Sequence, residues 1–128
     1  MSGPVPQEDN PSISDEDRLV RRVRPHQLVR EGASVRPSSA VFKSEELSIY
    51  IESLLVEQGR VLGSTLEKYP TEFLTSVRAG EVRKFEHAIV KDTAPPNDPA
   101  HGLVLGKKKE RFANAMVRCQ EWIVPRND

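Results

Sequence analysis

Prolines divide this chain into short segments, and this limits the possible folds more than any other feature. Pro25 and Pro70 each end any helix that precedes them, because the residue before a proline is pushed toward extended backbone. Pro37 lies in a third stretch, and residues 92–99 contain three prolines and an Asn-Asp pair, which exclude regular structure. The remaining segments favour several short strands and few helices.

Five of these segments have the alternating or β-branched composition of strands: 18–24, 47–51, 73–77, 85–91 and 101–105. A second interpretation applies to one of them. Residues from Ser44 onward also fit a helix, with Leu47, Ile51 and Leu54 on one face. Between these two interpretations, we favour a strand followed by a helix.

The clearest helical pattern lies near the C-terminus. A helix from about 107 to 119 would place Phe112, Ala115, Met116 and Cys119 on one buried side. Further helix is expected within 52–68, with single turns at 26–30 and 79–84, and Trp122, Ile123 and Val124 are expected to close the core. This order predicts an α+β fold, with a single mainly antiparallel sheet and helices packed on one face.

The N-terminal residues differ in composition from the rest. Residues 1–17 are rich in proline, serine and acidic residues, and they offer almost nothing to bury. The free energy gained by burying so few apolar groups does not offset the conformational entropy that such a segment loses on ordering. We therefore expect a disordered tail at 1–17 and a single α+β domain at 18–128.

Cysteine content and hydropathy indicate the compartment. Cys119 is the one cysteine, so no disulfide forms within the chain, as is typical of a reducing environment. The N-terminus lacks the basic and apolar regions of a secretory signal, and no apolar run approaches the roughly 20 residues that span a membrane. We expect a cytoplasmic protein without a membrane partner.

Opposite charges balance, with 19 Lys and Arg against 19 Asp and Glu. Because nucleic-acid binders usually carry a basic excess, nucleic acid is a possible partner but not the favoured one. The charge is nevertheless uneven along the chain. Residues 18–36 hold six arginines and one acid, and residues 107–111 read Lys-Lys-Lys-Glu-Arg. Whether these two basic patches share a face is left open by the sequence.

No motif of established chemistry is present. The chain has no phosphate loop, dinucleotide-binding glycine pattern, nucleophile elbow or zinc-ligand spacing. We therefore predict no cofactor and no metal site. Cys119 lies on the apolar side of the predicted helix, which is typical of a core cysteine.

His101 is the strongest candidate for a catalytic residue. It follows Asn97, Asp98 and Pro99, where a stiff loop enters a strand. A histidine held there by a carboxylate or a carbonyl and open to solvent has what a general acid/base requires. The alternative is structural: Asn97 and Asp98 satisfy turn amides while His101 bonds to the backbone.

A second candidate is an anion-binding site. Arg36 offers a guanidinium fork for a carboxylate or phosphate, and Ser38 and Ser39 offer hydroxyl groups beside Pro37. With Arg83 these residues would bind an anionic ligand, near Asp98 and His101. The alternative is an ordinary salt bridge and two turn serines.

Two of these segments belong to a recognisable pattern. Arg36-Pro-Ser-Ser-Ala-Val-Phe42 and Asn97-Asp-Pro-Ala-His-Gly-Leu-Val-Leu-Gly106 resemble segments of a family of small uncharacterised bacterial proteins. The resemblance spans 18–124 and departs from the pattern at Asp98 and Gly102. It implies a bacterial or phage source, and it carries no activity, cofactor or catalytic residue.

Two functions fit the sequence. The first is a non-enzymatic binding or accessory protein that acts through a protein partner, consistent with small size, balanced charge and absent catalytic motifs. The second is a small enzyme or ligand-binding protein for a phosphate-bearing substrate such as a nucleotide or RNA, with His101 as the acid/base. The second gains support if His101, Arg36 and Arg83 converge in one solvent-reachable pocket, and it loses support if each is paired separately on a convex surface.

Overall fold

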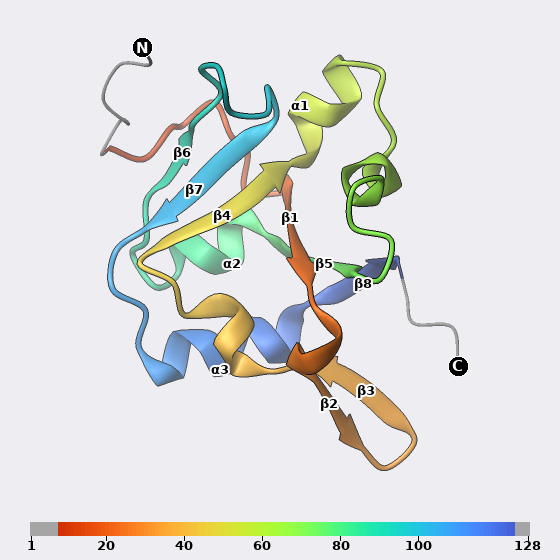
Figure 1. The fold of residues 1–128 in the computed structure, drawn as a ribbon. Helices are drawn as coiled ribbons and strands as arrows, with labels where there is room; N and C mark the ends of the chain where they lie inside the picture. The colour runs from red at the N-terminus through yellow and green to blue at the C-terminus, as the bar shows by residue number, and fades with distance from the viewer. Residues whose placement is uncertain (1–7, 125–128) are drawn as a thin grey trace.

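An antiparallel sheet of six strands, in the order β6-β7-β4-β1-β5-β8, is the centre of the computed structural model, which describes residues 8–124 (Figure 1). This confirms the predicted α+β class. The strands of the sheet are β1 (Arg18–Val23), β4 (Glu46–Ile51), β5 (Phe73–Arg78), β6 (Ile89–Lys91), β7 (His101–Leu105) and β8 (Glu121–Val124). A separate hairpin is formed by β2 (Leu28–Glu31) and β3 (Ser34–Pro37).

Three α-helices accompany the sheet: α1 (Glu52–Glu57), α2 (Ala79–Arg83) and α3 (Glu110–Cys119). Three 3-10 turns complete the order: η1 (Pro25–Gln27), η2 (Ser39–Phe42) and η3 (Leu62–Leu66). The segment from Ser44 is therefore a strand followed by a helix, as favoured from the sequence.

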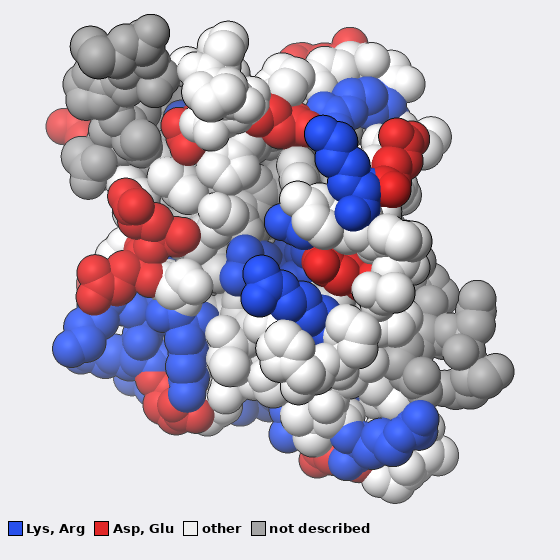
Figure 2. All heavy atoms as spheres, viewed as in Figure 1, with Lys and Arg blue, Asp and Glu red and all other residues white. Residues whose placement is uncertain are grey.

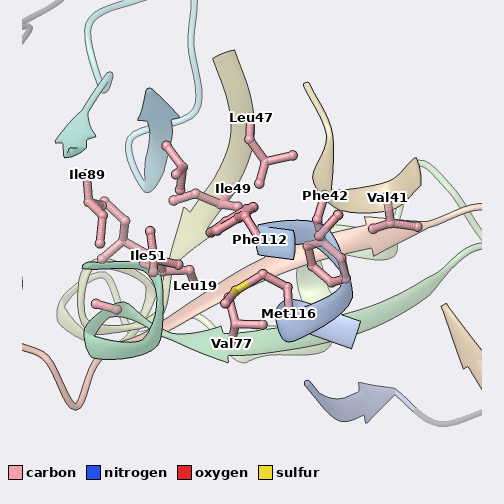
Figure 3. Close-up of a cluster of buried hydrophobic side chains, with 14 of the residues drawn as sticks. Leu19, Val41, Phe42, Leu47, Ile49, Ile51, Val77, Ile89, Phe112 and Met116 are labelled. Atoms are coloured by element: carbon pink, nitrogen blue, oxygen red, sulfur yellow. The ribbon is translucent and has the colours of Figure 1, made fainter. Parts of the chain in front are cut away.

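The core lies between one face of the sheet and α2, α3 and η2. Leu19, Ile49 and Val77 point from the strands toward Phe112 and Met116 of α3 (Figure 3). Phe112 and Met116 are buried, so the helical spacing seen in the sequence does mark the inner side of α3. Trp122 is half-buried and donates from Nε1 to the Val35 carbonyl, which ties the sheet to the hairpin.

The strand register determines which side chains lie on the face of the sheet that points away from the core. Paired residues of neighbouring strands point to the same side, and successive residues alternate. Val20 pairs with Tyr50, and Tyr50 pairs with His101. These three residues therefore lie together on the face opposite to that of Leu19.

Gly102 is required by packing. A Cβ added at this position would lie 2.8 Å from the Val90 carbonyl oxygen and 2.7 Å from Cδ1 of Ile51. The first of these neighbours is backbone and has no freedom to move aside. Any side chain at residue 102 would therefore force β7 away from its neighbours.

Three segments differ from the sequence prediction. The expected turn at 26–30 is shortened to η1, and its later residues form β2. Only Ile89–Lys91 of the expected strand 85–91 is extended, because the chain first turns at Glu86, where φ is +62°. Residues 121–124 form an edge strand paired with β5, and Trp122 of this strand packs against the core.

The predicted tail also requires correction. Residues 8–17 pack on the domain: Ile13 is 1% exposed and belongs to the core, and the Asn10 amide donates to the Ile89 carbonyl. One apolar side chain and several polar anchors give this segment the contacts that its composition alone did not suggest. Residues 1–7, the rest of the predicted tail, lie outside the described residues.

Replacing Ile13 with alanine tests this packing. Removal of a fully buried isoleucine side chain is expected to lower the free energy of unfolding by about 2–5 kcal/mol. Val61, 73% exposed, is the matched control, and Val61→Ala should change stability by about 0.5 kcal/mol or less. Equal urea denaturation midpoints for Ile13→Ala and wild type would show that residues 8–17 do not pack on the domain.

Candidate functional site

Strands β1 and β4 separate shortly after they meet. They pair only at Leu19–Ile51 and Val20–Tyr50. From there β1 stays with β5 as far as Val23, whereas β4 stays with β7. A gap therefore opens inside the sheet, and Figure 1 shows the two strands diverging like the arms of a V.

Arg21 spans this gap. Its Nη1 donates to the Ser48 carbonyl at 3.0 Å, and its Nε donates to the Val41 carbonyl of η2 at 3.2 Å. The bond to Ser48 occupies a carbonyl of β4 that would have accepted from a backbone amide if β1 and β4 had stayed paired. Across residues 8–124, Arg21 forms no ion pair with a carboxylate.

Two adjoining hollows lie over the gap and share Arg21 and Arg22 in their walls. Their volumes are about 120 Å³ and about 300 Å³. We call them together the arginine groove, and Figure 2 shows basic side chains gathered there, in the middle of the face. The polar residues lining it are Arg21, Arg22, Arg24, Gln27, Ser44, Ser48, Tyr50, Glu72 and His101.

Positive charge exceeds negative charge in the arginine groove. Arg22 is 3.2 Å from Glu72, and its guanidinium lies 3.6 Å from the centre of the Tyr69 ring. Glu72 is the only carboxylate in the lining, against three arginines. Burial, and then the charges of Arg22 and Arg24, lower the pKa of Arg21 below its usual value. The groove therefore favours an anionic ligand.

His101 lines the smaller hollow and is held by Asp92. Its Nδ1 lies 3.1 Å from an Asp92 carboxylate oxygen and 3.2 Å from the Asp92 carbonyl oxygen. Both partners are acceptors, so Nδ1 carries the hydrogen and Nε2 remains available for a ligand. The neighbouring Tyr50 keeps its phenol proton, because burial raises its pKa.

Asp98, predicted as a ligand-binding residue, is instead bonded within the chain. Its carboxylate forms two bonds to Arg60, at 2.8 and 2.9 Å, and accepts from the Ala100 amide. The Arg60 bonds hold the pKa of Asp98 below its usual value. The contact between Asp98 and His101 is a backbone one: the Asp98 carbonyl accepts a hydrogen bond from the His101 amide.

The other predicted site residues lie elsewhere. Arg36 is in the β2–β3 hairpin, paired with Glu31, and Ser38 and Ser39 begin η2 beside it. Arg83 of α2 is bonded to Asp9, Asp15 and the Asn10 carbonyl. None of these side chains lines the hollow of His101, so the predicted convergence does not occur among the described residues. The acids that engage Arg83 come from the segment expected to be a tail.

The segments singled out in the sequence nevertheless reach the groove. The carbonyl of Val41, from the Arg36–Phe42 segment, accepts from Arg21, and His101 comes from the second segment. Arg21, Arg22, Tyr50 and Asp92 were not predicted. The excess of arginine in 18–36 was the signal for the first two, whereas the pairing of β4 with β7 lies beyond local sequence patterns.

Within residues 8–124, no three His, Cys, Asp or Glu side chains are grouped to hold a metal ion. The described helices also include none with the length and apolar character needed to cross a membrane. No protein-family model, curated protein or solved structure matches the chain. Function is therefore inferred from the geometry of the chain itself.

A second cation, Lys108, is buried away from the groove. Its Nζ donates to the carbonyl oxygens of Glu45, Val104 and Gly106, at 3.0, 2.8 and 2.5 Å. Burial lowers the pKa of Lys108 to about 8. These three bonds fix the loop between β7 and α3.

The pH dependence of stability tests the burial of Lys108. The folded state releases the proton near pH 8, whereas the unfolded chain holds it to about 10.5. Since the unfolded state then binds more protons, stability is expected to rise between about pH 8 and about pH 10. Lys108→Met should lack this rise, and taking the difference between wild type and variant cancels the opposing effect of Tyr50. Parallel curves of unfolding free energy against pH would contradict the lowered pKa.

Proposed function

We propose that this protein is a non-enzymatic binding protein that holds an acidic segment of a protein partner in the arginine groove. The observation that carries the proposal is the charge of the lining, with Arg21, Arg22 and Arg24 around a hollow that contains one carboxylate. Guanidinium groups bind carboxylates through paired, charge-assisted hydrogen bonds. Arg21 is already held by two carbonyls, so it meets a ligand in a fixed position.

An aromatic side chain beside the groove supports a protein as the partner. Tyr69, which stacks on Arg22, is 37% exposed. Aromatic and arginine side chains are the residues most often responsible for affinity in protein interfaces. A ligand recognised by its charge alone would make no use of this ring.

Cytoplasmic location and a bacterial source are part of the proposal. The single cysteine supports a reducing compartment, and the burial that raises the pKa of Cys119 makes it a poor nucleophile. The resemblance of the 36–42 and 97–106 segments supports the bacterial source.

Binding of a dodecaglutamate peptide tests the groove. Arg24 is exposed, and Arg24→Gln is expected to weaken the binding about tenfold at low ionic strength through loss of one charge-assisted contact. Arg30→Gln removes the same charge from the exposed β2 and should leave the dissociation constant unchanged. Titration calorimetry measures both. Equal weakening by the two variants would mean that only net charge matters, and would contradict a site at the groove.

A second function is favoured by one observation, the bond between Asp92 and His101. A histidine oriented by a carboxylate, with its other nitrogen available, is the usual arrangement of a general base. Arg22 beside it would hold a phosphate group, and the protonated Tyr50 would donate a proton to a leaving oxygen. The protein would then be a small enzyme acting on a phosphate-bearing substrate such as a nucleotide or RNA.

Hydrolysis of bis(p-nitrophenyl) phosphate distinguishes the two functions. If His101 is a general base, His101→Ala should lower the turnover of this phosphodiester by about 10²–10⁴-fold without loss of folding. The binding protein proposed first predicts no turnover above the buffer blank for wild type. Asp92→Asn tests the carboxylate that orients His101. Near-wild-type turnover in both the His101→Ala and the Asp92→Asn variant would exclude a catalytic pair of Asp92 and His101.

A further inference from the structure

A third hollow lies between the end of α2 and the start of α3, away from the arginine groove. Its volume is about 420 Å³, within the usual range for a small-molecule site. Cationic and aromatic side chains dominate its lining: Lys84, Phe85, His87, Lys107, Lys109 and Arg111. Phe112 and Glu86 complete it.

Two local conformations build this hollow. Glu86 has a left-handed backbone, with φ of +62°, and turns the chain sharply after α2. On the other side, the three carbonyl bonds of Lys108 fix the loop before α3. Lys107 and Lys109 flank this buried residue, and both are exposed at the rim.

The aromatic residues form one connected cluster. The ring of Phe112 meets Phe85 edge-on at 5.5 Å and His87 edge-on at 4.6 Å, measured between ring centres. The Nδ1 of His87 bonds to the Leu105 carbonyl at 2.9 Å, which fixes the ring. Phe85 and His87 are only half-buried, and the Arg111 guanidinium lies over the Phe85 ring, 5.5 Å from its centre, so a base stacked on Phe85 would lie beside or displace this cation.

The cations at the rim are poorly neutralised. Lys84 pairs with Glu81, and Glu110, the first residue of α3, pairs with Lys43. Lys107, Lys109 and Arg111 form no ion pair within residues 8–124. Three unpaired positive charges therefore surround an aromatic hollow that contains a single acid, Glu86.

We propose that this hollow is a nucleotide-binding site. The phosphate groups would meet Lys107, Lys109 and Arg111, and the base would lie against Phe85 and His87. Cations attract phosphate, and aromatic rings stack on any base, so one site of this kind accepts a free nucleotide or a nucleotide of a single strand. The proposal is independent of the arginine groove and of its partner.

Binding of ADP, pyrophosphate and a 12-nucleotide adenylate RNA tests this site. The wild-type protein should bind ADP or the RNA at least tenfold more tightly than pyrophosphate, because only the nucleotide has a base to stack. The double variant Lys107→Ala/Lys109→Ala should lose at least tenfold in that affinity. Phe85→Leu should also weaken it, while pyrophosphate binding stays unchanged.

Two controls keep the test decisive. Lys68→Ala removes an exposed lysine that is not among the lining residues, and Arg24→Gln removes a charge from the arginine groove. Both should bind ADP and the RNA as wild type does. Equal affinity for pyrophosphate and ADP, no binding of either nucleotide probe, or equal loss in Lys68→Ala would overturn the proposal. The tighter of the two nucleotide probes identifies the source of the ligand.

Discussion

The bonds from Arg21 to the Ser48 and Val41 carbonyls are the interactions on which the groove depends. Strands that diverge within a sheet leave backbone groups unpaired, and a buried unpaired carbonyl costs about 1–3 kcal/mol. A guanidinium has five donors in a rigid fork, so the Arg21 side chain donates to both carbonyls where the strands have separated. The side chain that satisfies these carbonyls also places a positive charge in a hollow.

Charge and strand register then determine which ligands can bind to the sheet face that carries Tyr50 and His101. Because paired residues share a face, Val20, Tyr50 and His101 come together next to Arg22, with Asp92 behind the imidazole. Three other arginines are neutralised: Arg18 pairs with Glu52, Arg60 with Asp98, and Arg83 with Asp9 and Asp15. The arginine groove and the hollow beside α3 each combine a cavity with an excess of cations over acids, and Figure 2 shows basic side chains both in the groove and at the loop that leads into α3.

Local pattern predicted the strands and α3, because alternation and helical spacing report directly on burial. It failed where a contact joins distant residues. Ile13 belongs to the same buried cluster as residues from the rest of the chain, and nothing in an acidic, proline-rich segment signals that burial. For the same reason the sequence identified His101 but left the group that holds it unnamed, and the structure shows that this group is Asp92, across the proline loop. Arg36 and Arg83 are residues of a type that binds anions, but Glu31 pairs with Arg36, and Asp9 and Asp15 of the distant N-terminal segment pair with Arg83.

The central claim is that an acidic peptide binds where β1 and β4 separate, and nuclear magnetic resonance tests it most directly. Uniformly ¹⁵N-labelled protein would be titrated with the glutamate peptide while amide shifts are followed. We expect the largest shifts in residues 20–24, 48–50 and 101, with small changes at the β2–β3 hairpin and at Lys68. Shifts spread evenly over the exposed lysines and arginines, or centred on the loop at 106–109, would contradict a binding site in the arginine groove.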